Sequence, residues 1–95
     1  MKSELCIMPE NDQYSTTRFN GSERHEVFGA VNRDKSIKYG LVIFITPEQH
    51  RTGKTSIHLN PNNWLWLKGL AQKTWRKYYN KTKEDFIKEF GRNYE

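Results

Sequence analysis

Five consecutive branched or aromatic apolar residues, Leu41 to Ile45, are followed closely by Pro47. A short apolar run of this composition, ended by a proline, predicts a β-strand buried on both faces. In a 95-residue chain of which only 35% is hydrophobic, such a strand must lie at the centre of a single small core. The stretch "RHEVFGAV" predicts a second strand over residues 24–28. Because a short connection joins the two strands, we expect an antiparallel hairpin.

The connection between these two strands, "NRDKSIKYG", is rich in basic residues and ends in a glycine. It is interpreted as a basic loop. Residues 1–22 are polar and rich in turn-forming residues, so they predict an irregular N-terminal arm with a short strand near Leu5 to Met8.

A long helix is predicted after the hairpin. Asn60 can cap it, Pro61 fits the first helical position, and Asn80 marks its end. Residues spaced by three and four predict one buried face: Trp64, Leu67, Ala71, Trp75 and Tyr78. Trp66 lies off this face; we expect it to pack under the last helix, and the alternative is a base-stacking surface.

A second, short helix is predicted from Thr82 to Gly91. Thr82 and Asp85 have the spacing of a capping box, and a glycine is typical of a helix C-terminus. The pattern therefore predicts an α+β fold in which residues 23–95 form a single domain behind the arm of residues 1–22.

Charge and cysteine content limit the classes of function. The net charge of +5 suits nucleic acid or another anionic partner. A single cysteine, Cys6, excludes an intramolecular disulfide and a four-cysteine zinc site, which favours a reducing, cytoplasmic location. Neither a signal peptide nor a membrane-spanning stretch is recognised, so we expect no membrane partner.

The stretch "TPEQHRTGKTSIHLNPN" contains two of the three histidines, His50 and His58. Its "RTGKTS" matches only the end of a phosphate-binding loop, because Glu48 stands where the first glycine should be. If the hairpin forms as expected, the segment holding His25 and Glu26 comes close to both histidines. Imidazole and carboxylate groups together suit a divalent metal that keeps open coordination positions. Three unrelated surface histidines are the alternative.

Larger motifs point to a known family. The runs "ERHEVFGAVNRDKSIKYGLVIFITPEQHRTGKTSIHLN", "LKGLAQKTWRKYY" and "FGRNYE" resemble small phage and prophage proteins of the HNH endonuclease-like type over roughly residues 23–94. The segments "SIKYGL" and "FGRNY" are the more specific parts of this resemblance.

The resemblance implies a ββα-metal fold, in which a hairpin and a helix hold one divalent ion (magnesium, manganese, nickel or zinc) that binds a DNA phosphate. It assigns the catalytic position to His25 and Glu26 and metal binding to His50 and His58. Which of His25 and Glu26 is the base and which a ligand stays open. The resemblance also implies DNA as substrate, and a homodimer or a phage packaging protein as further partners.

This chain departs from the family pattern. Thr46 and Gln49 replace the cysteines of the "CPECH" step, which removes a zinc knuckle, and the central asparagine has no clear counterpart, although Asn32 is a candidate substitute. The alternative functions are therefore a DNA-binding or inhibitory protein that has lost cleavage, and an interaction module that uses the Trp-rich helix. The residues predicted to contact nucleic acid are Arg24, Arg33, Lys35, Lys38, Arg51 and Lys54.

Overall fold

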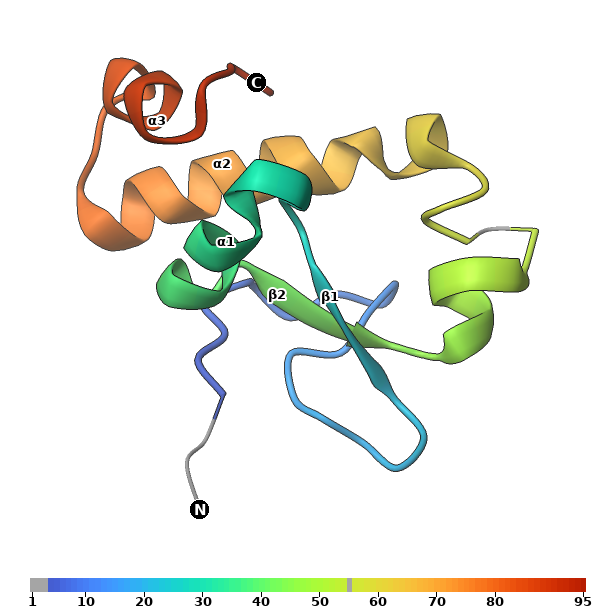
Figure 1. The fold of residues 1–95 in the computed structure, drawn as a ribbon. Helices are drawn as coiled ribbons and strands as arrows, with labels where there is room; N and C mark the ends of the chain where they lie inside the picture. The colour runs from blue at the N-terminus through green and yellow to red at the C-terminus, as the bar shows by residue number, and fades with distance from the viewer. Residues whose placement is uncertain (1–3, 55) are drawn as a thin grey trace.

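The computed structural model describes residues 4–54 and 56–95. Residues 1–3 of the predicted arm and Thr55 of "RTGKTS" lie outside this range. The described chain forms a small α+β fold, as predicted (Figure 1). In chain order its elements are β1 (Glu23–Glu26), η1 (Ala30–Asn32), α1 (Arg33–Tyr39), β2 (Val42–Ile45), η2 (Glu48–Thr52), η3 (Pro61–Trp64), α2 (Leu65–Tyr79) and α3 (Lys83–Phe90).

The predicted hairpin is confirmed. Strands β1 and β2 pair in antiparallel register, with His25 opposite Ile43, and every residue of β2 is buried. The backbone of Ser15, in the arm, forms a bridge to Phe44 on β2. Because the hairpin strand and the arm both contact β2, the most apolar segment of the chain becomes the centre of the fold.

The segment between the strands contains a helix, so the prediction of a basic loop was wrong. Ser36 is the buried residue of α1, and its hydroxyl accepts a hydrogen bond from Phe28 N (2.9 Å) and donates one to Phe28 O (2.7 Å). Gly40 ends the helix at a φ of 79°, a left-handed conformation that favours glycine. The helix was missed because its core contacts come from few side chains and the rest of its surface is polar.

The predicted short strand near Leu5 to Met8 is also absent, although these residues lie within the described range. The segment runs beside the hairpin instead. Ile7 N donates to Gly40 O (2.8 Å), and the Cys6 thiol donates to Val42 O (3.0 Å). Desolvation by burial raises the pKa of that thiol.

Helix α2 begins after the short helix η3 and uses the predicted face for the core, because Trp64, Leu67, Ala71 and Trp75 are all buried. Tyr78 is 61% exposed, so its place on that face was wrong. Trp66 does not pack under α3, which lies along the other half of α2 (Figure 1). It is 41% exposed and stacks on Tyr14 of the arm.

The predicted second helix is confirmed as α3. Thr82 and Asp85 form the reciprocal hydrogen bonds of a capping box, and Gly91 ends the helix at a φ of 86°. Helix α3 closes an aromatic cluster, which consists of Phe28, Trp75, Phe86, Phe90 and Tyr94.

The C-terminal "GRNYE" follows α3 and folds back onto α2. The buried amide of Gln72 donates to Asn93 Oδ1 and to Glu95 Oε2, both at 2.8 Å, and its oxygen accepts from Tyr94 N at 2.6 Å. The Arg76 guanidinium adds an ion pair to Glu95 at 2.7 Å. This segment therefore fastens the chain end over the helix.

Candidate metal centre

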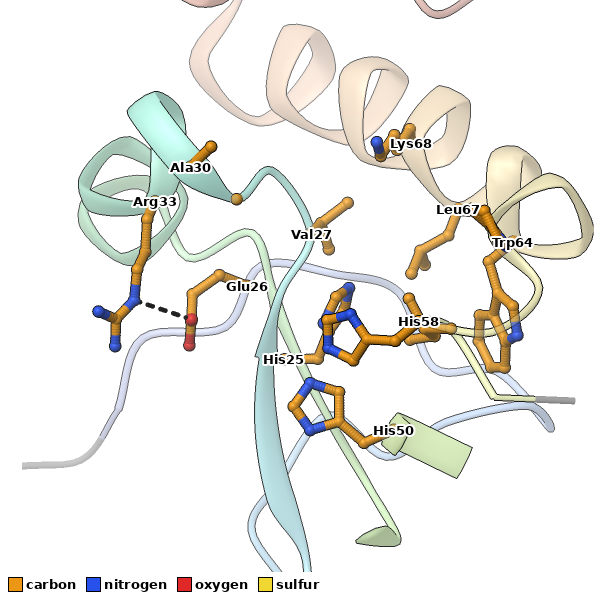
Figure 2. A pocket seen from close by; sticks show the side chains of 13 residues that line it. His25, Glu26, Val27, Ala30, Arg33, His50, His58, Trp64, Leu67 and Lys68 are labelled. Atoms are coloured by element: carbon orange, nitrogen blue, oxygen red, sulfur yellow. Dashed lines mark hydrogen bonds and ion pairs between the residues drawn. The ribbon is translucent and has the colours of Figure 1, made fainter. Parts of the chain in front are cut away.

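The three histidines of the chain converge at one point. His25 lies on β1, His50 in η2, and His58 in the turn that leads to η3 (Figure 2). One ring nitrogen of each lies within 4.8 Å of the corresponding nitrogens of the other two. The set can hold one metal ion, which confirms the predicted meeting of these side chains and rejects the reading of three unrelated histidines.

The backbone of the β2–α2 connection places His50 and His58 side by side. Ile57 N donates to Gln49 O (2.9 Å) and His58 N to His50 O (3.4 Å), so the two halves of the connection run together. Gly53 allows the reversal, because a Cβ at this position would lie 2.7 Å from Glu48 Cγ. The glycine in "RTGKTS" therefore closes a histidine-bearing loop.

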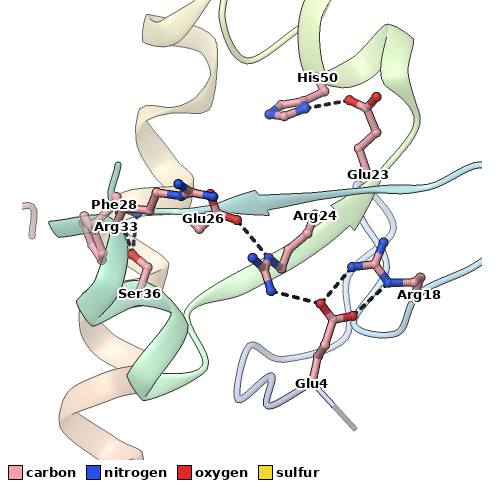
Figure 3. Close-up of polar contacts among 9 residues, drawn as sticks. All are labelled: Glu4, Arg18, Glu23, Arg24, Glu26, Phe28, Arg33, Ser36 and His50. Carbon is pink, nitrogen blue, oxygen red and sulfur yellow. Dashed lines mark hydrogen bonds and ion pairs between the residues drawn. The ribbon is translucent and has the colours of Figure 1, made fainter. Parts of the chain in front are cut away.

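A carboxylate orients His50. His50 Nδ1 lies 2.9 Å from Glu23 Oε1 (Figure 3). In the tautomer that carries its proton on Nδ1, His50 donates a hydrogen bond to Glu23, and Nε2 is left as the metal-binding nitrogen. Glu23, at the start of β1, was not predicted from the sequence. A carboxylate on the same strand as His25, two residues away and therefore on the same face, is the signal that could have identified it.

The environment of His25 favours the neutral imidazole. Burial, together with the neighbouring His50 and His58, lowers the pKa of His25 to about 4. At neutral pH this side chain is therefore uncharged and can donate a lone pair to a metal.

Glu26 belongs to a different set of contacts. Successive residues of a strand point to opposite faces, and Glu26 lies among arginines, with Arg24 Nε at 2.9 Å and Arg33 Nε at 3.1 Å (Figures 2 and 3). Burial acts to raise the pKa of Glu26, but the hydrogen bonds from the two guanidinium groups outweigh it and hold the pKa below its usual value. His25 and Glu26 are thus adjacent in sequence and separate in their contacts.

Several of the predicted nucleic-acid contacts are engaged within the protein. Arg24 also pairs with Glu4 (3.0 Å), and Lys35 pairs with Glu89 (3.5 Å). Arg51 lies 3.5 Å from the carboxylate of Glu23.

Lys38 and Lys54 are exposed, and Lys38 Nζ lies 5.1 Å from the ring centroid of Tyr39. Arg33, alone of the six predicted basic residues, lines the histidine cavity.

The histidines open into a cavity of about 460 Å³. Its apolar walls include Val27, Trp64 and Leu67, and its cationic side chains are Arg33 and Lys68 (Figure 2). Lys68 was missed by the sequence reasoning, because helical spacing assigns it only to the edge of the buried face of α2. The cavity thus combines three histidines with two cations from separate elements, and the Glu26 carboxylate also lines it.

No protein-family model matches the chain, and no curated protein or solved structure matches it either. Among residues 4–54 and 56–95, no helix has both the length and the apolar character needed to cross a bilayer.

Proposed function

We propose that this protein is a metal-dependent endonuclease that hydrolyses DNA phosphodiester bonds on an HNH-like arrangement of hairpin and helix. The convergence of His25, His50 and His58 carries the proposal. The order of elements also supports it, because the histidines lie on β1 and in the connection to α2. The ββα-metal identity is part of the proposal.

The three histidines fit a divalent ion by their chemistry. Each offers an imidazole nitrogen, and Glu23 orients one of the rings from outside the cluster. A donor set of imidazoles suits zinc or nickel better than magnesium, which prefers oxygen ligands. A bound divalent ion would supply Lewis-acid polarisation of a phosphoryl oxygen.

The cations at the cavity have a separate role. Arg33 and Lys68 approach from different elements and can bind the non-bridging oxygens of a phosphate. Glu26 holds the Arg33 guanidinium at the cavity edge. Because Glu26 is ion-paired and its pKa is lowered, it suits this positioning task better than proton abstraction.

The ion pairing of Glu26 also favours a second candidate function. If Glu26 is unsuited to act as a base and His25 is a metal ligand, the centre lacks a dedicated proton acceptor. A DNA-binding or inhibitory protein that retains the scaffold without cleavage is then the alternative.

The test is a nicking assay on supercoiled plasmid with magnesium, manganese, nickel or zinc, beside a chelator. We expect ion-dependent nicking that His50→Ala abolishes and that the control Thr52→Ala, an exposed residue of the same turn, leaves unchanged. Plasmid binding without nicking under any ion would favour the second function. Absence of both metal binding and nicking would overturn the proposal.

A further inference from the structure

A second surface of α2 carries charge and aromatic rings that the histidine centre does not use. Trp66, Leu70, Lys73 and Lys77 recur at spacings of four and three, so they form one stripe along the helix. We call this set the α2 stripe. It lies off the buried face, and none of its residues lines the histidine cavity.

A groove of about 520 Å³ lies between the α2 stripe and the N-terminal arm. Ile7 and Pro9 of the arm and Leu70 of the helix provide apolar surface, whereas Lys73 and Lys77 add two ammonium groups. The groove and the histidine cavity share no lining residue. Its volume is within the range of about 300–1,000 Å³ that is usual for small-ligand sites, so it is large enough for a planar aromatic group.

Positive charge extends beyond the groove. A neighbouring hollow is lined by four basic residues: Lys73, Arg76, Lys77 and Lys81. Arg76 pairs with Glu95, but the three lysines form no ion pair with any described residue. Lys81 lies near the Asp85 carboxylate, whereas Lys73 and Lys77, one helical turn apart, leave positive charge that favours a polyanion.

Exposed aromatic rings flank these lysines. Tyr78 is 61% exposed and its ring contacts that of Tyr79 at a centroid distance of 4.8 Å. Trp66, at the other end of the stripe, is 41% exposed and lies on Tyr14 with an interplanar angle of 18°. Trp66 also stacks on Trp64, with centroids 5.8 Å apart. Tyr78, which meets Tyr79 edge-on, is therefore the ring that offers an exposed stacking surface for a base.

We propose that the α2 stripe, together with Tyr78 and Lys81, binds single-stranded nucleic acid. Lys73 and Lys77 contact successive phosphates, because residues four apart on a helix lie about 5–6 Å from one another, and Lys81, just beyond the end of α2, adds a third positive charge. A base enters the apolar groove or stacks on Tyr78. Paired bases could not reach these surfaces, which favours a single strand over a duplex. This binding needs no metal and holds whether or not the histidine centre cleaves DNA.

The test is fluorescence anisotropy of labelled oligonucleotides at several salt concentrations, in the presence of a chelator. The probes are single strands of DNA and of RNA and a duplex of equal length. We expect the single strands to bind more tightly than the duplex. For the double variant Lys73→Gln/Lys77→Gln, the slope of log affinity against log salt should decrease by about 1.4, since each lost phosphate contact on a single strand contributes about 0.7.

A matched control distinguishes binding at the α2 stripe from attraction to the overall positive charge of the protein. Lys83→Gln/Lys88→Gln removes the same charge from α3 and should bind nearly as the parent protein does. Tyr78→Ala should weaken binding at least about fivefold without changing the salt slope, and thermal melts should show that all variants fold. His50→Ala should bind normally, so failure of the metal centre leaves this result intact.

Three results would overturn the proposal: no binding of either single strand, tighter binding of the duplex, or equal weakening by the α3 control. DNA and RNA strands bound equally would indicate contacts to phosphate and base alone, as proposed. Preference for one of them would support the site and show that it also contacts the sugar, ribose or deoxyribose.

Discussion

Helix α3, which closes the aromatic cluster, and the connection between β2 and α2, which bears two of the histidines, lie toward opposite ends of α2 (Figure 1). The aromatic cluster and the histidine centre are held together by different forces. In the cluster, rings pack at short distances, and Phe86 and Phe90 stack with centroids 4.4 Å apart. In the centre, the histidines face a cavity whose other walls are largely apolar, and backbone hydrogen bonds shape the loop. The difference predicts that the fold depends on the aromatic cluster more than on the histidines, which border a cavity that a ligand can enter.

Removal of a ring from the aromatic cluster should be the most damaging single change. Phe86 is fully buried and contacts Phe28, Trp75 and Phe90. Phe86→Ala should lower the free energy of unfolding by about 3–5 kcal/mol, because it leaves a cavity. Denaturant unfolding without metal measures this, and His58→Ala, at an exposed residue, should change it by less than about 0.5 kcal/mol. Equal losses would mean that the histidine centre is part of the core.

Glu23→Gln should act at the histidine centre alone. An amide at this position is a weaker acceptor for His50 Nδ1 and orients the ring less well. Metal affinity should fall about 10–100-fold, as is typical when a carboxylate behind a histidine ligand is lost. Isothermal titration with zinc measures the affinity, and Glu48→Gln, at an exposed residue of the adjacent turn, is the matched control. Unchanged affinity in Glu23→Gln would contradict the role of Glu23 in orienting His50.

Thr82→Ala should slightly destabilise α3, at the aromatic end of the fold. It removes the N-cap of α3 and should cost about 1 kcal/mol of unfolding free energy. Backbone and side-chain hydrogen bonds with Thr82 lower the pKa of Asp85. This stabilisation is therefore present above the usual aspartate pKa and is lost as the pH falls through the lowered value. Thr82→Ala keeps the backbone N–H from which the Asp85 carboxylate accepts, so it should retain most of this pH dependence, whereas Asp85→Asn should lose it. Melting curves of Asp85→Asn and the parent protein should converge in acid; a constant difference down to low pH would contradict the assigned hydrogen bonds.

Local signals made much of the fold predictable. The β2 strand and the ends of α3 follow from composition and from capping residues a few positions apart, such as Thr82 and Asp85. Helix α1 was missed because its stability depends on Ser36 bonding to Phe28, a contact that no short-range pattern records. Tyr78 and Trp66 were misplaced because helical spacing does not show where a neighbouring helix ends.

The site was also predictable in part. Residue chemistry and a hairpin suggested that His25, His50 and His58 would meet, and the structure brings them together. The contacts that tune them were not predictable, because Glu23 and Lys68 gain their roles only from the register of β1 and the rotation of α2. The catalytic roles of His25 and Glu26 remain predictions.

The central claim is that the three histidines bind one divalent ion, and a thermal-shift titration tests it most directly. Zinc or nickel added to chelator-treated protein should raise the melting temperature until one equivalent is bound. The gain in unfolding free energy should be about 2.7 kcal/mol at a hundredfold excess over the dissociation constant. His58→Ala should lose most of this gain, whereas Lys88→Gln should keep it. No shift with any divalent ion, or an equal shift in His58→Ala, would contradict the claim.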